Sequence, residues 1–308
     1  MPLPSWGGEA GGEGHPAPGL SYPLHTPYAP PMHPPCPVLH TASGATGMPY
    51  NGAPGGPFFI PPSSDTVLSE HFWFWLPGYG DHLRSTCALV SAYLTTVGRS
   101  ANLILNMAPN TTGGLDPGDV TAYAAMGQAV QCLWEQQLGE ATGVMLDADG
   151  VVVIPWPSPF AVAPAAAASP LPLAVQLQED LVATGQRIVA WALDACVSPV
   201  AGDGDCLQGA WVPLLPAEGL PPNATTGIGH KRILQADLAA PPPPLLQTAA
   251  TADTGAWLSA LRFSALTAYA WETLPSAPLR LARIALFNWT HVTQGGACVP
   301  ADCQLPRF

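Results

Sequence analysis

Charged residues are scarce in this sequence. Asp, Glu, Lys and Arg make up 10% of the 308 residues, and Lys231 is the only lysine. The formal net charge is -12 at pH 7, and a chain of that sign is repelled by the phosphates of nucleic acids and of lipid surfaces. We therefore expect no nucleic-acid partner, no polybasic membrane contact and no regulation through acetyl-lysine.

No hydrophobic run is suited to cross a membrane. Residues 150–178 lack any charge but contain six prolines, a density that a spanning helix does not tolerate. The first nine residues have neither a basic segment nor an apolar run, so they do not resemble a signal peptide. We expect neither a membrane anchor nor a membrane partner.

Cysteine is too sparse for a disulfide scaffold, with seven residues in a chain of this length. Two pairs are close in sequence, Cys196 with Cys206 and Cys298 with Cys303, and they are the expected disulfides. Neither pair lies near histidines that could complete a zinc site. No metal site is therefore expected.

Three glycosylation sequons begin at Asn110, Asn223 and Asn288. Chance gives one or two in a chain this long, so this signal is modest. Together with the cysteine pairs, the sequons favour a glycoprotein of the secretory pathway, either extracellular or in a lysosome or vacuole-like compartment. The missing signal peptide argues the other way.

Proline and glycine are distributed unevenly. Residues 1–57 contain 14 of the 38 prolines and 11 of the 31 glycines. A segment with this composition cannot contribute to a helix or a central strand, so residues 1–57 are predicted to be disordered. Residues 146–178 are rich in proline and alanine, and they are predicted to be a linker.

Residues 58–145 have an α/β pattern. Apolar residues at spacings of four and three predict a helix that follows Asp81 as N-cap and ends at Gly98. The apolar run 101–107 predicts a buried parallel strand. Asp116, followed by a proline, predicts the start of a second helix.

Residues 179–308 alternate between apolar and polar positions in several short runs. The clearest runs are 257–265 and 280–287, and loops rich in proline, glycine and alanine separate them. This period of two predicts strands, and many short strands predict an antiparallel β-sandwich.

Four stretches carry a resemblance to a known family. They are residues 59–66 (FIPPSSDT), 71–75 (HFWFW), 96–106 (TVGRSANLILN) and 225–233 (TTGIGHKRI). In this order they resemble the α-L-fucosidases of glycoside hydrolase family 29, in particular the plant-type branch. Residues 185–188 (GQRI) are also similar to the sandwich domain of that family.

The resemblance implies a fold that is α/β plus all-β. Residues 58–145 would form the C-terminal portion of a (β/α)8-type catalytic barrel, with its last strand at 102–106. Residues 179–308 would form the β-sandwich. Most of the barrel has no counterpart in the sequence, so we expect a truncated family member.

The resemblance also implies retaining hydrolysis of fucosylated oligosaccharides or glycoconjugates, without a cofactor. Such enzymes use two carboxyl groups about 5–5.5 Å apart. No residue of this sequence matches the nucleophile, and Ser63 stands at the family's candidate acid/base position, where a glutamate is expected. A serine hydroxyl cannot replace a tuned carboxylic acid. A sugar-binding relative without catalysis is therefore the alternative.

Three residues are candidates for substrate binding. Trp73 and Trp75 could pack against the sugar ring, or they could belong to an aromatic core. Asp65 is kept from the family motif and could accept a hydrogen bond from a sugar hydroxyl, or it could be an ordinary turn carboxylate. The sequence leaves these alternatives open.

Overall fold

The computed structural model describes residues 62–70, 72–162, 171–215, 227–238, 256–268 and 278–289, together with 292, 298–300, 303 and 305. All of them belong to one compact unit of the chain, His33–Phe308. The predicted disordered segment 1–57 lies outside the described residues. No helix among them is long and apolar enough to cross a membrane.

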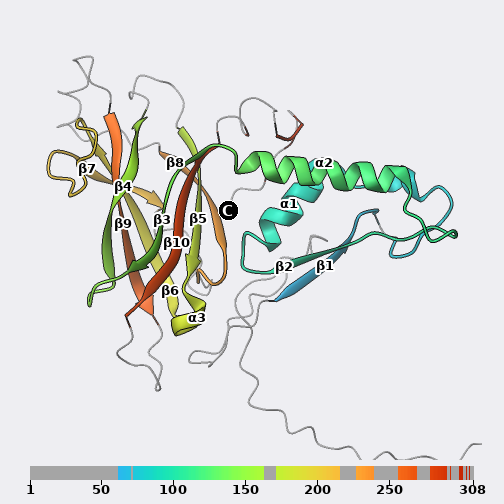
Figure 1. The fold of residues 1–308 in the computed structure, drawn as a ribbon, viewed down its shortest axis with the longest axis horizontal. Helices are drawn as coiled ribbons and strands as arrows, with labels where there is room; N and C mark the ends of the chain where they lie inside the picture. The colour runs from blue at the N-terminus through green and yellow to red at the C-terminus, as the bar shows by residue number, and fades with distance from the viewer. Residues whose placement is uncertain are drawn as a thin grey trace, which may run out of the picture. The chain divides into compact units, whose positions relative to one another are not determined.

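The described elements form a short α/β unit followed by an all-β region (Figure 1). In chain order they are β1 (Ser63–Val67), η1 (Tyr79–His82), α1 (Thr86–Thr96), β2 (Asn102–Asn106), α2 (Pro117–Leu133), β3 (Gln137–Met145), β4 (Val151–Val162), β5 (Leu171–Glu179), α3 (Leu181–Thr184), β6 (Ile188–Ser198), β7 (Ala210–Leu215), β8 (Arg232–Leu238), β9 (Ala256–Ala268) and β10 (Arg280–Asn288).

Two four-stranded antiparallel sheets form the sandwich. The first has the order β3-β10-β5-β8, and the second has the order β4-β9-β6-β7. Every second residue points into a shared core, so Val175 and Leu177 from β5 join the same buried cluster as Leu261 and Phe263 from β9. The predicted sandwich is confirmed, because the period of two in the sequence is the pleat of these strands.

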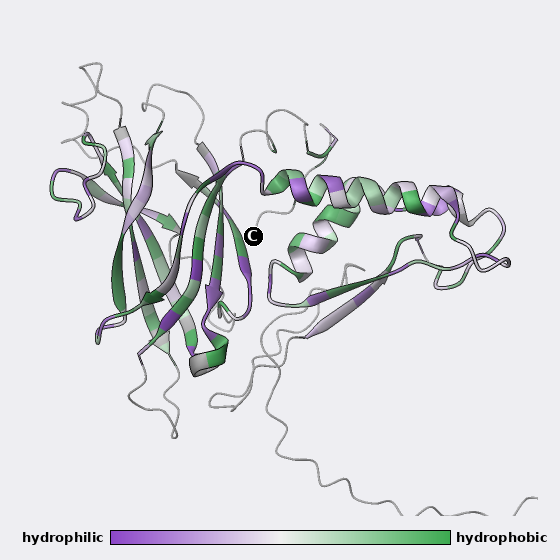
Figure 2. Ribbon diagram, viewed as in Figure 1, coloured by the Kyte–Doolittle hydropathy of each residue, from purple (hydrophilic) through white to green (hydrophobic). Residues whose placement is uncertain are grey.

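The first sheet is buried on both faces. Along β10, Ile284 and Leu286 face the sandwich core, whereas Ala285 and Phe287 belong to a second cluster. That cluster also contains residues from both long helices, so α1 and α2 cover the outer face of this sheet. In Figure 2 the strands of this sheet are accordingly largely hydrophobic, with polar residues at intervals.

The two remaining strands, β1 and β2, form a parallel pair, with Ser63 opposite Asn102. One face of the pair packs toward the helices through Leu103 and Leu105. On the other face, Ile104 is 55% exposed. The pair has the strand direction and the helix-covered outer face of a (β/α)8 barrel, and the fold is consistent with part of such a barrel followed by a β-sandwich.

The first helix begins later than predicted. Asp81 lies in the short helix η1, and Ser85 is the N-cap of α1, where its hydroxyl accepts a hydrogen bond from Ala88 N at 3.2 Å. Gly98 follows the helix as expected. Its role is close packing, because a Cβ at this position would lie 2.3 Å from the carbonyl oxygen of Leu94.

The predicted linker at 146–178 is wrong. β4 lies entirely within this segment, and β5 begins there, so the sandwich starts with β3 at residue 137 and not at 179. β4 is an edge strand, and its prolines at 155, 157 and 159 alternate along it. Their missing N–H groups therefore fall on one side of the strand, and an edge strand needs only its other side for pairing.

The disulfides only partly follow proximity in sequence. Cys196 and Cys206 are joined. The expected pairing of Cys298 with Cys303 is wrong, because Cys298 bonds to Cys132 of α2 and Cys303 bonds to Cys87 of α1. Both bonds attach the carboxyl-terminal residues to the helical layer.

Candidate functional site

The candidate site is a loop that follows the carboxyl end of β1. The loop is closed at its base by a bridge between Ser69 and Leu83 and by a hydrogen bond from Glu70 N to His82 O at 2.7 Å. Arg84 N donates to Leu68 O at 2.9 Å, and this hydrogen bond and that of Glu70 N flank the bridge. These contacts bring the two ends of the loop together.

Trp73 lies at the exposed side of this loop and not in a strand. Its carbonyl oxygen accepts a hydrogen bond from Nδ2 of Asn106 at 2.9 Å, and Asn106 is the last residue of β2. The backbone at Trp73 is thus fixed to the end of a parallel strand. Its side chain remains 49% exposed, so a broad aromatic surface is presented at the carboxyl end of β1 and β2.

Trp75 is held by the N-cap residue of α2. Its indole N–H donates to Oδ2 of Asp116 at 2.6 Å, and Nδ2 of Asn110 donates to Oδ1 of the same carboxylate at 3.0 Å. The hydrogen bonds from Asn110 and Trp75 lower the pKa of Asp116. The ionised carboxylate of Asp116 therefore connects the loop after β1 to the loop after β2. Trp75 takes part in this connection through its indole N–H.

Ser63 and Asp65 lie on the exposed face of β1, away from the helices. Asp65 is opposite Ile104 of β2 in the register of the pair. This face corresponds to the inside of a (β/α)8 barrel, because the helices cover the outside. The structure shows no hydrogen bond between these two residues and the tryptophans of the loop.

One carboxyl group near the loop escaped the sequence analysis. Asp119, in the first turn of α2, is 0% exposed, and neither of its carboxylate oxygens has a hydrogen-bond partner. Burial and the nearby charge of Asp116 raise its pKa. A general acid must reach the leaving oxygen of the substrate, and a carboxyl group buried beneath the helix does not. An aspartate next to a helix start looks like an ordinary exposed residue in the sequence.

The expected sequons differ in their surroundings. Asn110 lies in the loop after β2, where its Oδ1 accepts from the hydroxyl of Thr112 at 2.7 Å. Asn288 is the last residue of β10, and its backbone lies in the sheet opposite Leu173. Asn223 lies outside the described residues.

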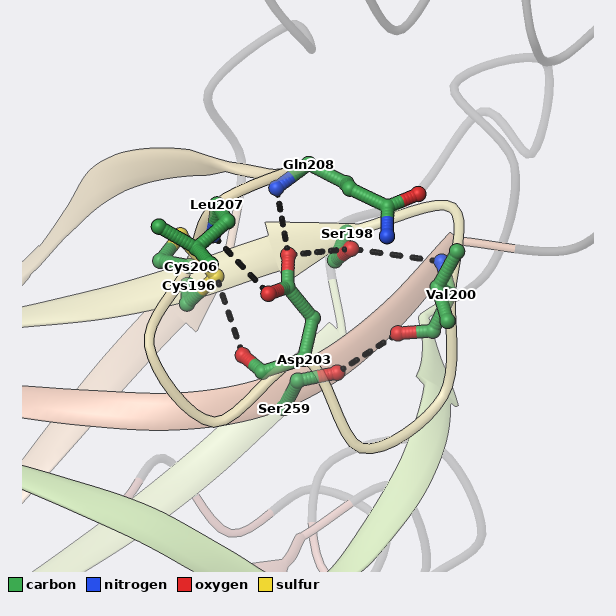
Figure 3. The surroundings of a disulfide bond; sticks show 8 residues. All are labelled: Cys196, Ser198, Val200, Asp203, Cys206, Leu207, Gln208 and Ser259. Atoms are coloured by element: carbon green, nitrogen blue, oxygen red, sulfur yellow. Dashed lines mark hydrogen bonds between the residues drawn. A yellow bond between two sulfur atoms is a disulfide. The ribbon is translucent and has the colours of Figure 1, made fainter.

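The loop between β6 and β7 is built around one carboxylate (Figure 3). Asp203 accepts hydrogen bonds from Leu207 N at 2.8 Å and Gln208 N at 2.9 Å, beside the Cys196–Cys206 disulfide. Burial raises the pKa of Asp203, but these N–H groups outweigh it and the pKa is lowered. Although Asp203 and the two sulfur atoms lie within 4.8 Å of one another, the sulfurs are bonded to each other and are not thiolate ligands.

No protein-family model and no curated protein sequence matches the chain. Solved structures do match its fold. A candidate α-L-fucosidase from Bacteroides thetaiotaomicron VPI-5482 matches with a TM-score of 0.51 and 18% identity over 78% of this chain and 42% of that chain. A candidate α-L-fucosidase from Bacteroides ovatus ATCC 8483 matches with a TM-score of 0.50 and 18% identity over 75% of this chain and 31% of that chain.

The fold is therefore similar to part of the fold of these two proteins. The chain spans less than half the length of the two proteins that it matches. The likeness supports the resemblance found in the sequence motifs at the level of the fold. The plant-type branch stays a prediction.

Proposed function

We propose that this chain is part of an α-L-fucosidase-like glycoside hydrolase, to which it contributes a loop that contacts the sugar. The observation that carries the proposal is the position of Trp73. Its backbone is held by Asn106 at the carboxyl end of two parallel strands, its ring is exposed, and the surrounding fold is that of fucosidases. In barrels of this kind the binding site lies at that end of the strands.

The chemistry of L-fucose suits such a surface. One face of a pyranose ring and the methyl group of fucose are apolar, and an aromatic ring can cover both. Trp73 would supply this platform, and Asp65, which is exposed on β1, would accept a hydrogen bond from a sugar hydroxyl. Trp75 would act indirectly, because its indole N–H is already bound to Asp116.

The proposed reaction is retaining hydrolysis of a fucosylated oligosaccharide or glycoconjugate. It needs a nucleophile and an acid/base about 5–5.5 Å apart. No residue of this sequence is matched to the nucleophile, and the resemblance in sequence aligns Ser63 with the family's candidate acid/base. In the part of the chain that the structure describes, burial raises the pKa of Asp119 and of Glu179, and neither of these two residues is exposed.

Sugar binding without hydrolysis is the second proposed function, and Ser63 favours it. The two proposals share the Trp73 platform and differ only in catalysis. They can therefore be tested one after the other, first for binding and then for hydrolysis.

Binding is tested by titrating L-fucose into the full chain in a calorimeter. Trp73→Ala should weaken binding about tenfold or more, because a buried aromatic contact in a complex commonly contributes that much. Phe74→Ala, on the same loop and 82% exposed, is the matched control and should leave binding unchanged. Equal affinity in the wild-type chain and in Trp73→Ala would contradict both proposed functions.

Hydrolysis is tested with 4-nitrophenyl α-L-fucoside and the Ser63→Glu variant. Release of 4-nitrophenol that appears only with the new carboxyl group would support the enzyme proposal and place the acid/base at position 63. Fucose binding without release in either protein would support the alternative.

We also propose the secretory pathway as the place of this protein. Three disulfides support this, because such bonds persist in oxidising compartments. In that pathway, Asn110 would be the preferred glycan acceptor among the described sequons, since it lies in a loop. A mass shift on enzymatic deglycosylation that disappears in Asn110→Gln would establish it.

A further inference from the structure

The two sulfur atoms of the Cys196–Cys206 disulfide differ in their access to solvent. Cys196 lies within β6, between Ala260 of β9 and Trp211 of β7, and it is 0% exposed. Cys206 lies in the loop between β6 and β7 and is partly exposed. The next residue, Leu207, is 83% exposed. A thiol in solution can therefore reach Cys206 more readily than Cys196.

The backbone of this loop fixes the difference. Cys206 has a φ of 57°, a region that residues other than glycine seldom occupy. Its backbone N–H donates to Asp203 O at 3.1 Å. On the other side of the bond, a Cβ at Gly209 would lie 2.8 Å from Sγ of Cys196. The chain at Gly209 thus packs closely against the buried sulfur, whereas Cys206 stays at the surface of the loop.

Asp203 places a negative charge beside both sulfur atoms. One of its carboxylate oxygens lies within 4.8 Å of each Sγ. Its pKa is lowered, so the carboxylate is ionised at neutral pH. Figure 3 shows how it is held, since Ser198 Oγ donates to Oδ2 at 2.9 Å and accepts from Val200 N at 3.2 Å. Ser259 Oγ in turn donates to Val200 O at 3.1 Å. These contacts connect the carboxylate to β6 and β9.

The difference in access gives thiol–disulfide exchange at this bond a direction. A thiolate attacks Sγ of Cys206, a new S–S bond forms there, and the bond to Cys196 breaks. Cys196 leaves as a thiolate with the electron pair of the broken bond, and it then takes a proton from water. Negative charge therefore moves onto the two protein sulfurs, next to the carboxylate of Asp203. A thiol that carries a second negative charge is repelled further.

We propose that Cys206 is a site of thiol–disulfide exchange, and that the carboxylate of Asp203 selects the reacting thiol by its charge. Cationic thiols react fastest because their positive group is attracted to the carboxylate. Neutral thiols are intermediate, and anionic thiols are the slowest. Asp203 is a positioning residue, since it acts through its charge and forms no bond to sulfur. The inference does not depend on the proposed function, because this loop belongs to the sandwich.

The site of exchange is tested by trapping the mixed disulfide. Cys36, the seventh cysteine, lies outside the described residues and is blocked first with iodoacetamide. The folded full chain is then treated with cysteamine, which is cationic, quenched with acid, denatured and alkylated with N-ethylmaleimide. Mass spectrometry of the peptides should find cysteamine on Cys206 and the maleimide on Cys196.

The role of Asp203 is tested with thiols of different charge. Rate constants for cysteamine, neutral 2-mercaptoethanol and anionic 2-mercaptoethanesulfonate are measured at equal thiolate concentration and constant ionic strength. The ratio of the cysteamine rate to the sulfonate rate should be about tenfold higher in the wild-type chain than in Asp203→Asn. A merely looser loop would speed all three thiols by the same factor and leave this ratio unchanged.

Asp205→Asn is the matched control. It removes the same charge from the same loop, but Asp205 is exposed, so water and salt screen its effect. This variant should keep the ratio of the wild-type chain to within about twofold.

Four results would overturn the proposal. Two concern the site of exchange, namely a mixed disulfide on Cys196 or no exchange at this bond with any of the three thiols. The other two concern Asp203. They are a ratio in Asp203→Asn equal to that of the wild-type chain, and a fall in Asp205→Asn as large as that in Asp203→Asn.

Discussion

The hydroxyl of Ser100 accepts a hydrogen bond from the backbone N–H of Lys231, which lies 131 residues further along the chain. This contact joins the segment between α1 and β2 to the loop before β8. The two stretches were the longest motifs of the resemblance to fucosidases, and the structure shows that they form one junction. Ser100 therefore connects the α/β unit to the sandwich.

Ser100→Ala should destabilise the chain by about 2 kcal/mol. The variant leaves buried backbone groups of Ile228 and Lys231 without their partner, and it keeps a side chain in a backbone region that disfavours one. Ser100→Gly loses the same hydrogen bonds but relieves the backbone, so it should be less destabilising than alanine. Urea unfolding of the three proteins measures the order, and an alanine variant as stable as the wild-type chain would contradict it.

Glu179 should make the protein more stable in acid than at neutral pH. Burial raises its pKa from 4.5 to about 7, although Arg187 N, at 2.6 Å, and Ile188 N, at 2.9 Å, donate to its Oε1. Its Oε2 has no hydrogen-bond partner. Because the folded state holds the proton more tightly than the unfolded state, the contribution is fully present below about pH 4.5. It is lost as the pH rises to about 7.

The loss amounts to at most about 3 kcal/mol. Glu179→Gln keeps an oxygen acceptor for Arg187 N and Ile188 N but does not titrate. The difference in unfolding free energy between the variant and the wild-type chain, measured from pH 4 to pH 8, should favour the variant increasingly as the pH rises. A difference that is flat across this range would show that Glu179 does not hold its proton.

Asp119 should reduce the stability of the folded chain at neutral pH. Its folded-state pKa is raised, so its ionisation destabilises the fold as the pH increases. Asp119→Asn removes the buried charge and should raise the melting temperature at pH 7.5 but not at pH 3.5. Asp116→Asn should lower the melting temperature at pH 7.5. The pKa of Asp116 is lowered in the folded state, so the folded state is stabilised by the charged form of this carboxylate.

Local patterns determined what could be predicted from the sequence. The strands of 257–265 and 280–287 were recognised because alternation reports a pleat directly. β4 was missed because its prolines normally exclude a strand, and only its place at the edge of a sheet makes them acceptable. Edge position is a property of the assembled sheet and has no signal in the segment itself.

For the candidate site too, residue types could be predicted from the sequence, whereas long-range contacts could not. Trp73 could be selected by residue type and motif, whereas its anchoring by Asn106 depends on which strands pair. The cysteines show the same limit, since Cys298 lies five residues from Cys303 yet bonds to Cys132, 166 residues away. Contacts of this kind depend on the packing of α2 against the first sheet, which no spacing in the sequence specifies.

The two long-range disulfides should contribute more stability than the short one. Cys87–Cys303 and Cys132–Cys298 close segments of 216 and 166 residues, whereas Cys196–Cys206 closes one of 10. In the chain-entropy account, a loop longer than 100 residues corresponds to about 5 kcal/mol and a short loop to about 3 kcal/mol.

Replacing Cys132 and Cys298 by serine should therefore lower the free energy of unfolding more than replacing Cys196 and Cys206. The first change also releases the carboxyl-terminal residues from a cluster in which Cys298 and Val299 are buried against α2 and the first sheet. Urea unfolding without reductant compares the two double variants, and full reduction of the wild-type chain should cause a larger loss than either, since it also breaks Cys87–Cys303. A larger loss from the short disulfide would mean that its loop, organised by Asp203, matters more than the attachment of the chain end to the helices.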